Sequence, residues 1–173
     1  MARKFTFVLG GAASGKSAYA ENLANSCGLA KVYLASAQAF DAEMQAKINV
    51  HISRRDAGWT TVEAPLEVAA ALRALNGDQV CLWDCATLWL SNQILAEADL
   101  DTAQADVLGA LQSCAAEVIV VSNEVGQGVV PEHALGRQFR EAQGRFNITL
   151  AARADRVVQV IAGLPNVLKG ERP

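Results

Sequence analysis

The stretch from Gly10 to Ser17, GGAASGKS, decides the fold that this chain is expected to adopt. It follows the apolar segment FTFVL at 5–9 and precedes a predicted helix at 16–27 that ends at Gly28. Its form, Gly-x4-Gly-Lys-Ser, is typical of loops that hold phosphate groups between a strand and a helix. Glycines let the backbone wrap around phosphate oxygens, to which the N–H groups at the start of the helix donate. The stretch therefore predicts a nucleoside triphosphate site.

The residues of this loop have separate expected roles. Lys16 would reach the β- and γ-phosphates and is a predicted catalytic residue, while Ser17 would place its hydroxyl on Mg²⁺. The alternative is a structural turn that fits the pattern by chance, which the flanking strand and helix argue against. Nucleotide contacts are predicted for Gly10, Gly11, Ala12, Ala13, Ser14, Gly15, Lys16 and Ser17.

Short apolar segments alternate with helical patterns along the chain. Strands are predicted at 4–9, 31–37, 58–65, 79–84, 117–124 and 155–163, and helices at 16–27, 41–55, 66–75, 87–98, 102–116 and 135–152. This alternation indicates a parallel sheet covered on both faces. We therefore predict an α/β, P-loop NTPase-like fold, with a mainly parallel sheet flanked by helices. The final stretch, LPNVLKGERP, is predicted to be loosely held.

The composition excludes several classes of protein. The 173 residues, 51% of them hydrophobic, fit a single nucleotide-binding catalytic domain spanning 1–173. A net charge of −3 argues against a broad nucleic-acid surface. No apolar run approaches the length of a membrane span, and the start MARKFTFVL is too short for a signal peptide, so we expect a cytoplasmic protein.

The cysteines do not suggest a metal site or disulfide bonds. Their spacing matches no zinc-binding pattern. We interpret them as reduced thiols, two of them in or beside apolar strands. They are Cys27, Cys81, Cys85 and Cys114.

An acidic residue ends the buried strand at 79–84. From this position Asp84 could bind Mg²⁺ or orient it through water, as in other phosphate-loop proteins. The alternative is that Asp84 caps the following helix. Glu124, which follows VIVVSN, is a competing candidate for the metal.

The chain has two histidines. On the predicted helix 41–55, His51 precedes Arg55 by four residues, so the two share a face. A neutral imidazole there could act as a nucleophile on a phosphate whose oxygens Arg55 and Lys47 neutralise. Spacing alone favours the simpler interpretation, a polar residue at the helix edge. His133, after Pro131, is interpreted as a polar loop residue.

Five segments in order carry a resemblance that changes this interpretation: GGAASGKS, EMQAKINVHISRR, LWDCATLWLSN, SNEVGQGVVPE and FREAQGRFN. With them the chain resembles the bifunctional adenosylcobinamide kinase and adenosylcobinamide-phosphate guanylyltransferase family of cobalamin biosynthesis, over nearly its whole length. The helix pattern E-M-x-x-basic-I-x-x-H-x-x-x-R and the pattern NEVGxGxVP are more specific than the phosphate loop alone.

The resemblance implies a two-step enzyme that assembles as a homotrimer. The γ-phosphate of ATP or GTP would first pass to the hydroxyl of adenosylcobinamide. His51, by motif position, would then attack the α-phosphate of GTP, and the bound GMP would pass to the new phosphate. Further nucleotide contacts are implied at Ala35, Ser36, Ala37, Ile52, Ser53, Arg54, Arg55, Glu63 and Asp84.

The chain also departs from the family pattern. Ala13 stands where the family commonly has arginine, Lys47 replaces arginine, and Ile148 follows Asn147 where glutamine is frequent. Two other functions remain open: a small-molecule kinase in which His51 is structural, and a nucleotide-dependent switch without a small-molecule acceptor. The loop EVGQGVVPE is a hypothetical substrate-side segment, because its glycines permit close approach.

Overall fold

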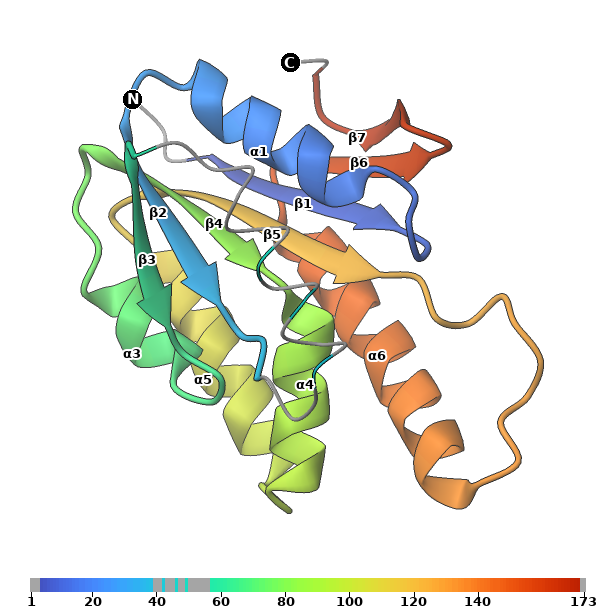
Figure 1. The fold of residues 1–173 in the computed structure, drawn as a ribbon. Helices are drawn as coiled ribbons and strands as arrows, with labels where there is room; N and C mark the ends of the chain where they lie inside the picture. Colours follow the sequence, from blue (N-terminus) through green and yellow to red (C-terminus); the bar gives the residue numbers. More distant parts are fainter. Residues whose placement is uncertain (1–3, 39–41, 43–45, 47–48, 50–56, 172–173) are drawn as a thin grey trace.

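The structure is a computed structural model that describes residues 4–38, 42, 46, 49 and 57–171. Its described part forms one seven-stranded sheet with the order β3-β2-β4-β5-β1-β6-β7, flanked by helices (Figure 1). The elements are β1 (Phe5–Gly10), α1 (Lys16–Ser26), β2 (Ala30–Ala35), β3 (Trp59–Glu63), α3 (Val68–Arg73), β4 (Gln79–Asp84), α4 (Ala86–Leu95), α5 (Leu100–Ser113), β5 (Glu117–Asn123), α6 (Ala134–Arg153), β6 (Arg156–Ile161) and β7 (Leu164–Lys169).

The strands β1 to β6 pair in parallel, as their continuous apolar sequences predict. Neighbouring residues of one strand face opposite sides of the sheet, so Phe7 and Val8 belong to two separate apolar clusters. The helices α3, α4, α5 and α6 cover one face of the sheet and α1 covers the other (Figure 1). The predicted α/β fold with a mainly parallel sheet is confirmed.

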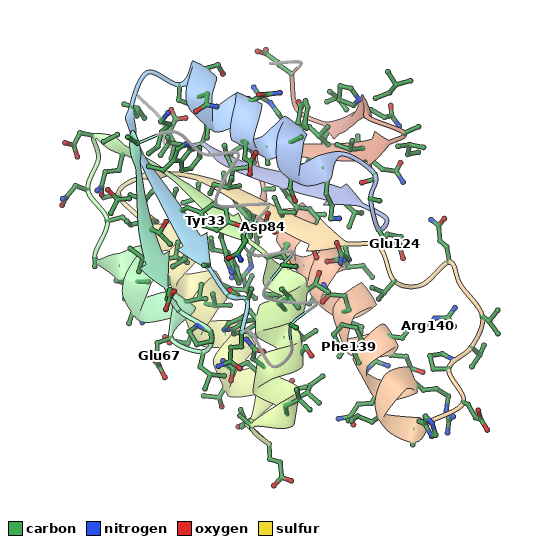
Figure 2. All side chains as sticks on the ribbon, in the orientation of Figure 1. Tyr33, Glu67, Asp84, Glu124, Phe139 and Arg140 are labelled. Atoms are coloured by element: carbon green, nitrogen blue, oxygen red, sulfur yellow. The ribbon has the colours of Figure 1, made fainter. Side chains whose placement is uncertain are left out.

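Alanines on α1 allow this helix to pack closely on its face of the sheet. Ala20 and Ala24 are fully buried there against apolar strand residues. Tyr33 of β2, labelled in Figure 2, contributes to the same cluster and packs edge-on against Trp59 of β3, with ring centroids 6.3 Å apart. Small side chains at these two positions therefore let the helix pack closely on the strands.

Aromatic rings fill the other face of the sheet. Trp89 of α4 lies between Trp83 of β4 and Phe146 of α6, with centroid distances of 5.8 and 5.4 Å. Its indole N–H donates to the Leu66 carbonyl at 3.0 Å, so the buried ring also has its polar group satisfied. This cluster ties α4 and α6 to the sheet beneath the ends of the strands.

The prediction that residues 164–173 are loosely held is wrong for Leu164–Lys169. Leu164–Lys169 forms β7, antiparallel to β6. The two strands are joined at Ala162 and Gly163, whose φ angles of 50° and 77° suit the two-residue turn that the twist of a hairpin favours. The turn makes β7 a continuation of the sheet.

The described cysteines are free thiols, and Cys81, Cys85 and Cys114 are buried. Cys27 is half-buried, and the reduced state of the thiols stays a prediction. No helix within the described ranges has both the length and the apolar character that crossing a membrane requires.

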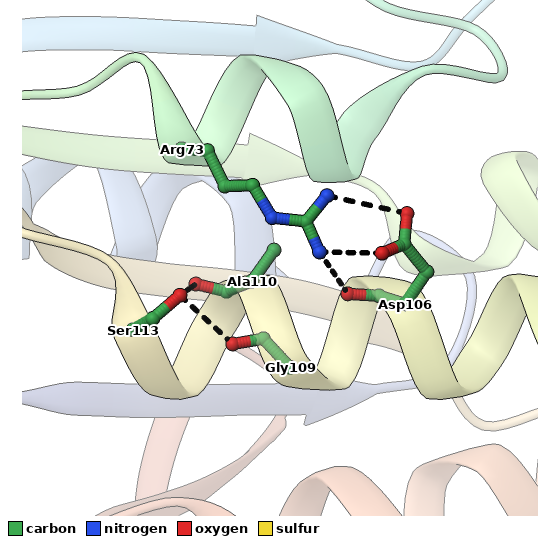
Figure 3. Close-up of polar contacts among 5 residues, drawn as sticks. All are labelled: Arg73, Asp106, Gly109, Ala110 and Ser113. Atoms are coloured by element: carbon green, nitrogen blue, oxygen red, sulfur yellow. Dashed lines mark hydrogen bonds and ion pairs between the residues drawn. The ribbon is translucent and has the colours of Figure 1, made fainter.

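An exposed ion pair links α3 to α5 (Figure 3). The Arg73 guanidinium donates to both carboxylate oxygens of Asp106 and to its backbone carbonyl. These hydrogen bonds hold the pKa of Asp106 below its usual range. A lowered carboxyl pKa contributes stability that is present above the ordinary pKa and is lost as the pH falls through the folded-state value.

We therefore expect Asp106→Asn to lower the melting temperature slightly at neutral pH and to have no effect in acid, where Asp106 is protonated in both states. Thermal unfolding of the wild type and the variant at several pH values checks this. An equal loss of stability at every pH would contradict the assigned role of the charge.

Candidate functional site

The phosphate loop lies between β1 and α1, as predicted. Gly10 ends β1, and Gly15 precedes the first turn of α1 with a φ of 92°, a left-handed conformation that favours glycine. A Cβ on Gly10 would lie 2.4 Å from the Ser14 hydroxyl and 2.8 Å from the Val160 carbonyl oxygen, so only glycine fits there. Two of the loop glycines are therefore required by the shape of the loop.

Lys16 folds back over the loop. Its Nζ donates to the Gly11 carbonyl at 3.1 Å, which places the ammonium group on the loop itself. The carbonyl holds this charge near the N-terminus of α1, whose free N–H groups also attract anions. The arrangement suits binding of a phosphate chain.

The β6–β7 turn supports the loop from the side. The Gly163 N–H donates to the Ser14 carbonyl at 2.8 Å. A Cβ on Gly15 would lie 3.1 Å from Gly163 Cα, so the two backbones are close. This contact could not be expected from the sequence, in which the segment after the turn was predicted to be loosely held.

The sheet register brings several predicted site residues to one edge. Ala35 of β2 pairs with Glu63 of β3 on one side and with Asp84 of β4 on the other. Gly10 pairs with Asn123 at the end of β5, which lies between β1 and β4. The loop, Asp84 and Glu63 therefore share the edge formed by the carboxyl ends of the strands, where open α/β sheets bind ligands.

Asp84 has a side-chain oxygen that the fold leaves unused. Its Oδ2 is buried and has no hydrogen-bond partner among the described residues. Burial, followed by the nearby Asp84 carboxylate, raises the pKa of the Cys85 thiol to about 12, while the Lys16 charge acts in the opposite direction. The charges of Lys16 and Asp84 thus both lie close enough to Cys85 to influence the pKa of its thiol.

The helix-cap interpretation of Asp84 does not fit this geometry. The N-cap of α4 is Cys85, and no side chain caps the helix. Glu124 is already used by its own loop, because its Oε1 accepts the Gly126 N–H at 2.6 Å. Figure 2 shows Asp84 near the middle of the sheet edge and Glu124 where the chain leaves β5.

A magnesium ion would find suitable donors at this edge. The buried, unpaired Asp84 Oδ2 is an oxygen ligand of the kind that Mg²⁺ takes, and Ser17 lies in the first turn of α1. The described residues contain no group of three or more His, Cys, Asp or Glu side chains that could hold a metal. Few protein ligands suit an ion that arrives with its nucleotide, because phosphate oxygens and water complete its shell.

The predicted nucleotide contact at Ser36 is not supported by the geometry of this residue. Ser36 is fully buried, and its hydroxyl accepts the Trp83 indole N–H at 2.7 Å. Its carbonyl accepts from Asn92 at 2.9 Å. Ser36 therefore anchors the end of β2 against β4 and α4. Ala35 and Ala37 on either side are half-buried and could contact a ligand through their backbones.

The second predicted part of the site lies outside the described residues. His51, Ile52, Ser53, Arg54 and Arg55 are in this group, as is Lys47. Of the predicted helix 41–55, the described residues Ala42, Ala46 and Asn49 are helical. The role of His51 as the nucleophile on the α-phosphate of GTP stays a prediction.

A buried polar network, which sequence reasoning also missed, lies beneath the end of β5. Ser122 donates to Asn147 Oδ1 at 2.6 Å and accepts from Gln143 at 2.9 Å. Thr87 of α4 lies 3.3 Å from the Ser122 hydroxyl. Gln143 and Asn147 are the inward-facing polar residues of FREAQGRFN, next to the buried Phe146. The sequence feature that could have indicated this network is the presence of two amides, Gln143 and Asn147, on the apolar stripe of a predicted helix.

The loop after β5 is fastened to α6. Arg140 donates to the Gly126 carbonyl, and Arg137 donates to the carbonyls of Pro131 and Glu132. Val129, in contrast, is 94% exposed. His133 precedes α6 and is exposed, in agreement with its interpretation as a polar loop residue. The loop has a fixed base and an exposed apolar tip.

Comparisons with known proteins identify the family. Residues 6–168 match the family model CobU, described as cobinamide kinase / cobinamide phosphate guanyltransferase. The chain belongs to this family. The cobinamide kinase / guanyltransferase family is the one expected from the five sequence segments, and its members are bifunctional enzymes.

Two curated relatives show how far the family likeness extends. The bifunctional adenosylcobalamin biosynthesis protein CobP of Pseudomonas aeruginosa is 45% identical over 167 residues, covering 95% of this chain and 96% of the relative. The protein CobU of Salmonella typhimurium, which carries the same description, is 37% identical, covering 91% of this chain and 95% of the relative. A solved structure from Pyrococcus horikoshii shares the fold, with a TM-score of 0.56 at 8% identity over 98% of this chain and 87% of the other.

Proposed function

We propose that this protein phosphorylates adenosylcobinamide with ATP or GTP and then transfers GMP from GTP to the product, giving adenosylcobinamide-GDP in cobalamin biosynthesis. The observation that carries the proposal is the shared sheet edge, at which the phosphate loop with Lys16 and the unpaired carboxylate oxygen of Asp84 both lie. Membership of the family supports these substrates, because the family's description names cobinamide and cobinamide phosphate.

In the kinase step, the chain's own residues bind and orient the nucleotide. The loop N–H groups and Lys16 hold the phosphates and neutralise the charge that develops on the γ-phosphate during transfer. Ser17 and Asp84 would hold a magnesium ion, which supplies further charge neutralisation at the phosphate oxygens. The hydroxyl oxygen of adenosylcobinamide forms the new bond to phosphorus, and the bond to the departing nucleoside diphosphate breaks.

In the second step, a nitrogen of neutral His51 attacks the α-phosphorus of GTP. A P–N bond forms, the bond to the β-phosphate oxygen breaks, and pyrophosphate leaves. An oxygen of the adenosylcobinamide phosphate then attacks the same phosphorus, and the imidazole leaves. Arg55 and Lys47 are the proposed cations on the phosphate under attack, and Ile52–Arg55 with Glu63 are proposed to contact the nucleotide.

A product assay tests the proposed function. The protein is incubated with adenosylcobinamide, Mg²⁺ and GTP, and the corrinoid products are separated with time. We expect adenosylcobinamide phosphate to form first and adenosylcobinamide-GDP to follow, with release of pyrophosphate. Phosphate product alone would indicate the kinase without guanylyl transfer, and GTP hydrolysis with unchanged corrinoid would indicate the nucleotide switch. The homotrimer and the cytoplasmic location stay predictions.

Asp84→Asn is expected to raise the Mg²⁺ concentration needed for half-maximal activity by roughly 10- to 100-fold, the usual cost of altering a group that holds a metal or its water. An amide keeps the shape of the side chain but loses the charge that favours the cation. Rates measured across a Mg²⁺ titration check this. Glu124→Gln is the matched control and is expected to leave the Mg²⁺ dependence unchanged. If instead Glu124→Gln raises the requirement and Asp84→Asn does not, Glu124 is the metal residue.

A further inference from the structure

The end of β5 is held more firmly than the sheet alone requires. The Asn123 N–H donates to the Thr87 hydroxyl at 2.7 Å, and the Asn123 carbonyl accepts from Asn147 Nδ2 at 3.1 Å. The next residue, Glu124, donates its N–H to the Gly10 carbonyl at 2.9 Å. Side chains of α4 and α6 therefore fix the backbone of Asn123 directly beside the first glycine of the phosphate loop.

The side chain of Asn123 is not used by this arrangement. Its Oδ1 is buried and has no hydrogen-bond partner among the described residues, as is true of Asp84 Oδ2. Such unsatisfied oxygens are uncommon in native proteins, and ordered water or a ligand is a frequent explanation. A residue whose backbone is fixed while its polar side chain stays unpaired fits a preorganised binding group.

The position of Asn123 indicates which ligand this would be. β5 lies between β1 and β4, so Asn123 stands between its register partner Gly10 and the strand that ends at Asp84. Other buried unpaired oxygens, such as those of Gln143 and Tyr19, do not end a strand at this edge. Two oxygen acceptors, one neutral and one charged, therefore end the two strands nearest the phosphate loop on this side.

We propose that Asn123 is a further residue of the nucleotide site, and this inference rests on the proposed function. Its side-chain oxygen accepts a hydrogen bond from a water molecule in the shell of the magnesium ion that accompanies the triphosphate, next to Asp84. Mg²⁺ in proteins keeps several of its waters, and those waters are strong donors that need oxygen acceptors. The network of Thr87, Ser122, Gln143 and Asn147 positions this acceptor.

Two near-isosteric variants with opposite expected effects test the proposal. GTP affinity is measured by titration calorimetry in Mg²⁺ and again in EDTA, and the ratio of the two affinities is compared with the wild type. Asn123→Leu removes the acceptor, so the ratio is expected to fall about tenfold. Asn123→Asp keeps an acceptor and adds a negative charge that repels metal-free GTP, so the ratio is expected to rise.

Asn166→Leu, on the exposed strand β7, is the matched control and should leave both affinities unchanged. A purely structural role for Asn123 would change both affinities equally in Asn123→Leu and leave the ratio for that variant constant, which would overturn the proposal. If Asn123→Leu unfolds, the ratio for Asn123→Ala, which also removes the acceptor, decides in its place. Lys16→Ala distinguishes a failure of this inference from a failure of the proposed function. If Lys16→Ala loses GTP binding while the affinity ratio stays constant in Asn123→Leu, only the role of Asn123 is rejected. Undiminished binding in Lys16→Ala rejects the nucleotide site itself.

Discussion

Replacing Lys16 by Ala is expected to reduce both the kinase and the guanylyltransferase rates by more than about 100-fold, the usual loss when a principal electrostatic donor to a reacting phosphate is removed. Lys16 Nζ lies on the loop carbonyl of Gly11, so the charge is already in place before a nucleotide binds. The described part of the chain offers one phosphate loop, and both chemistries are proposed to use it. GTP binding and the two product-forming rates are the measurements.

Lys4→Ala provides the control for this variant. Lys4 is exposed and immediately precedes β1, at the opposite end of the strand from the loop, so its removal changes the net charge equally without touching the site. We expect it to keep both activities. Full guanylyl transfer by the Lys16→Ala protein would reveal a second nucleotide site and would contradict a shared phosphate loop.

The second large effect is expected for His51→Asn, which should abolish covalent labelling of the protein. Incubation of the wild type with GTP labelled at the α-phosphate should leave GMP on the protein, and GTP labelled at the γ-phosphate should leave nothing. The variant should still bind GTP and keep at least part of its kinase activity, because the phosphate loop is intact. His133→Asn, at the other histidine, should label like the wild type.

The chemistry of the bond gives a further check on His51. A phosphoramidate is labile in acid and survives alkali, unlike a phosphate ester of serine. The attacking ring must be neutral, so labelling should decrease as the pH falls through the histidine pKa, about 6.5 when unperturbed. A variant without His51 that still becomes guanylylated, or a wild type that never does, would contradict the covalent mechanism.

The sequence predicted the parts of the fold that depend on local pattern. The glycine and lysine spacing of 10–17 placed the loop between a strand and a helix, and the apolar segments at 79–84 and 117–124 predicted buried parallel strands. Because the carboxyl ends of parallel strands meet at one edge of the sheet, this pattern was sufficient to predict that Asp84 and the phosphate loop lie at the same edge. The family, too, could be recognised from its motifs.

The sequence could not predict contacts that depend on register and on turns. The hairpin that carries β7 needs Ala162 in a left-handed conformation, which alanine seldom adopts, so the local signal was weak. The role of Ser36 depends on the Trp83 indole that reaches it from another strand. The Gln143 and Asn147 network becomes visible only when α6 is placed beneath β5.

The place of β1 in the sheet has a consequence for how the protein is made. Both strands that pair with β1, namely β5 and β6, begin only at Glu117 and Arg156. A chain still growing on the ribosome therefore carries the phosphate loop long before it carries the Glu124 N–H that holds Gly10 or the Gly163 N–H that holds Ser14. Because synthesis proceeds from the N-terminus at about 5–20 residues per second, the proposed nucleotide site becomes complete several seconds after its loop has been made. Prematurely terminated chains should consequently be unable to sequester the nucleotide.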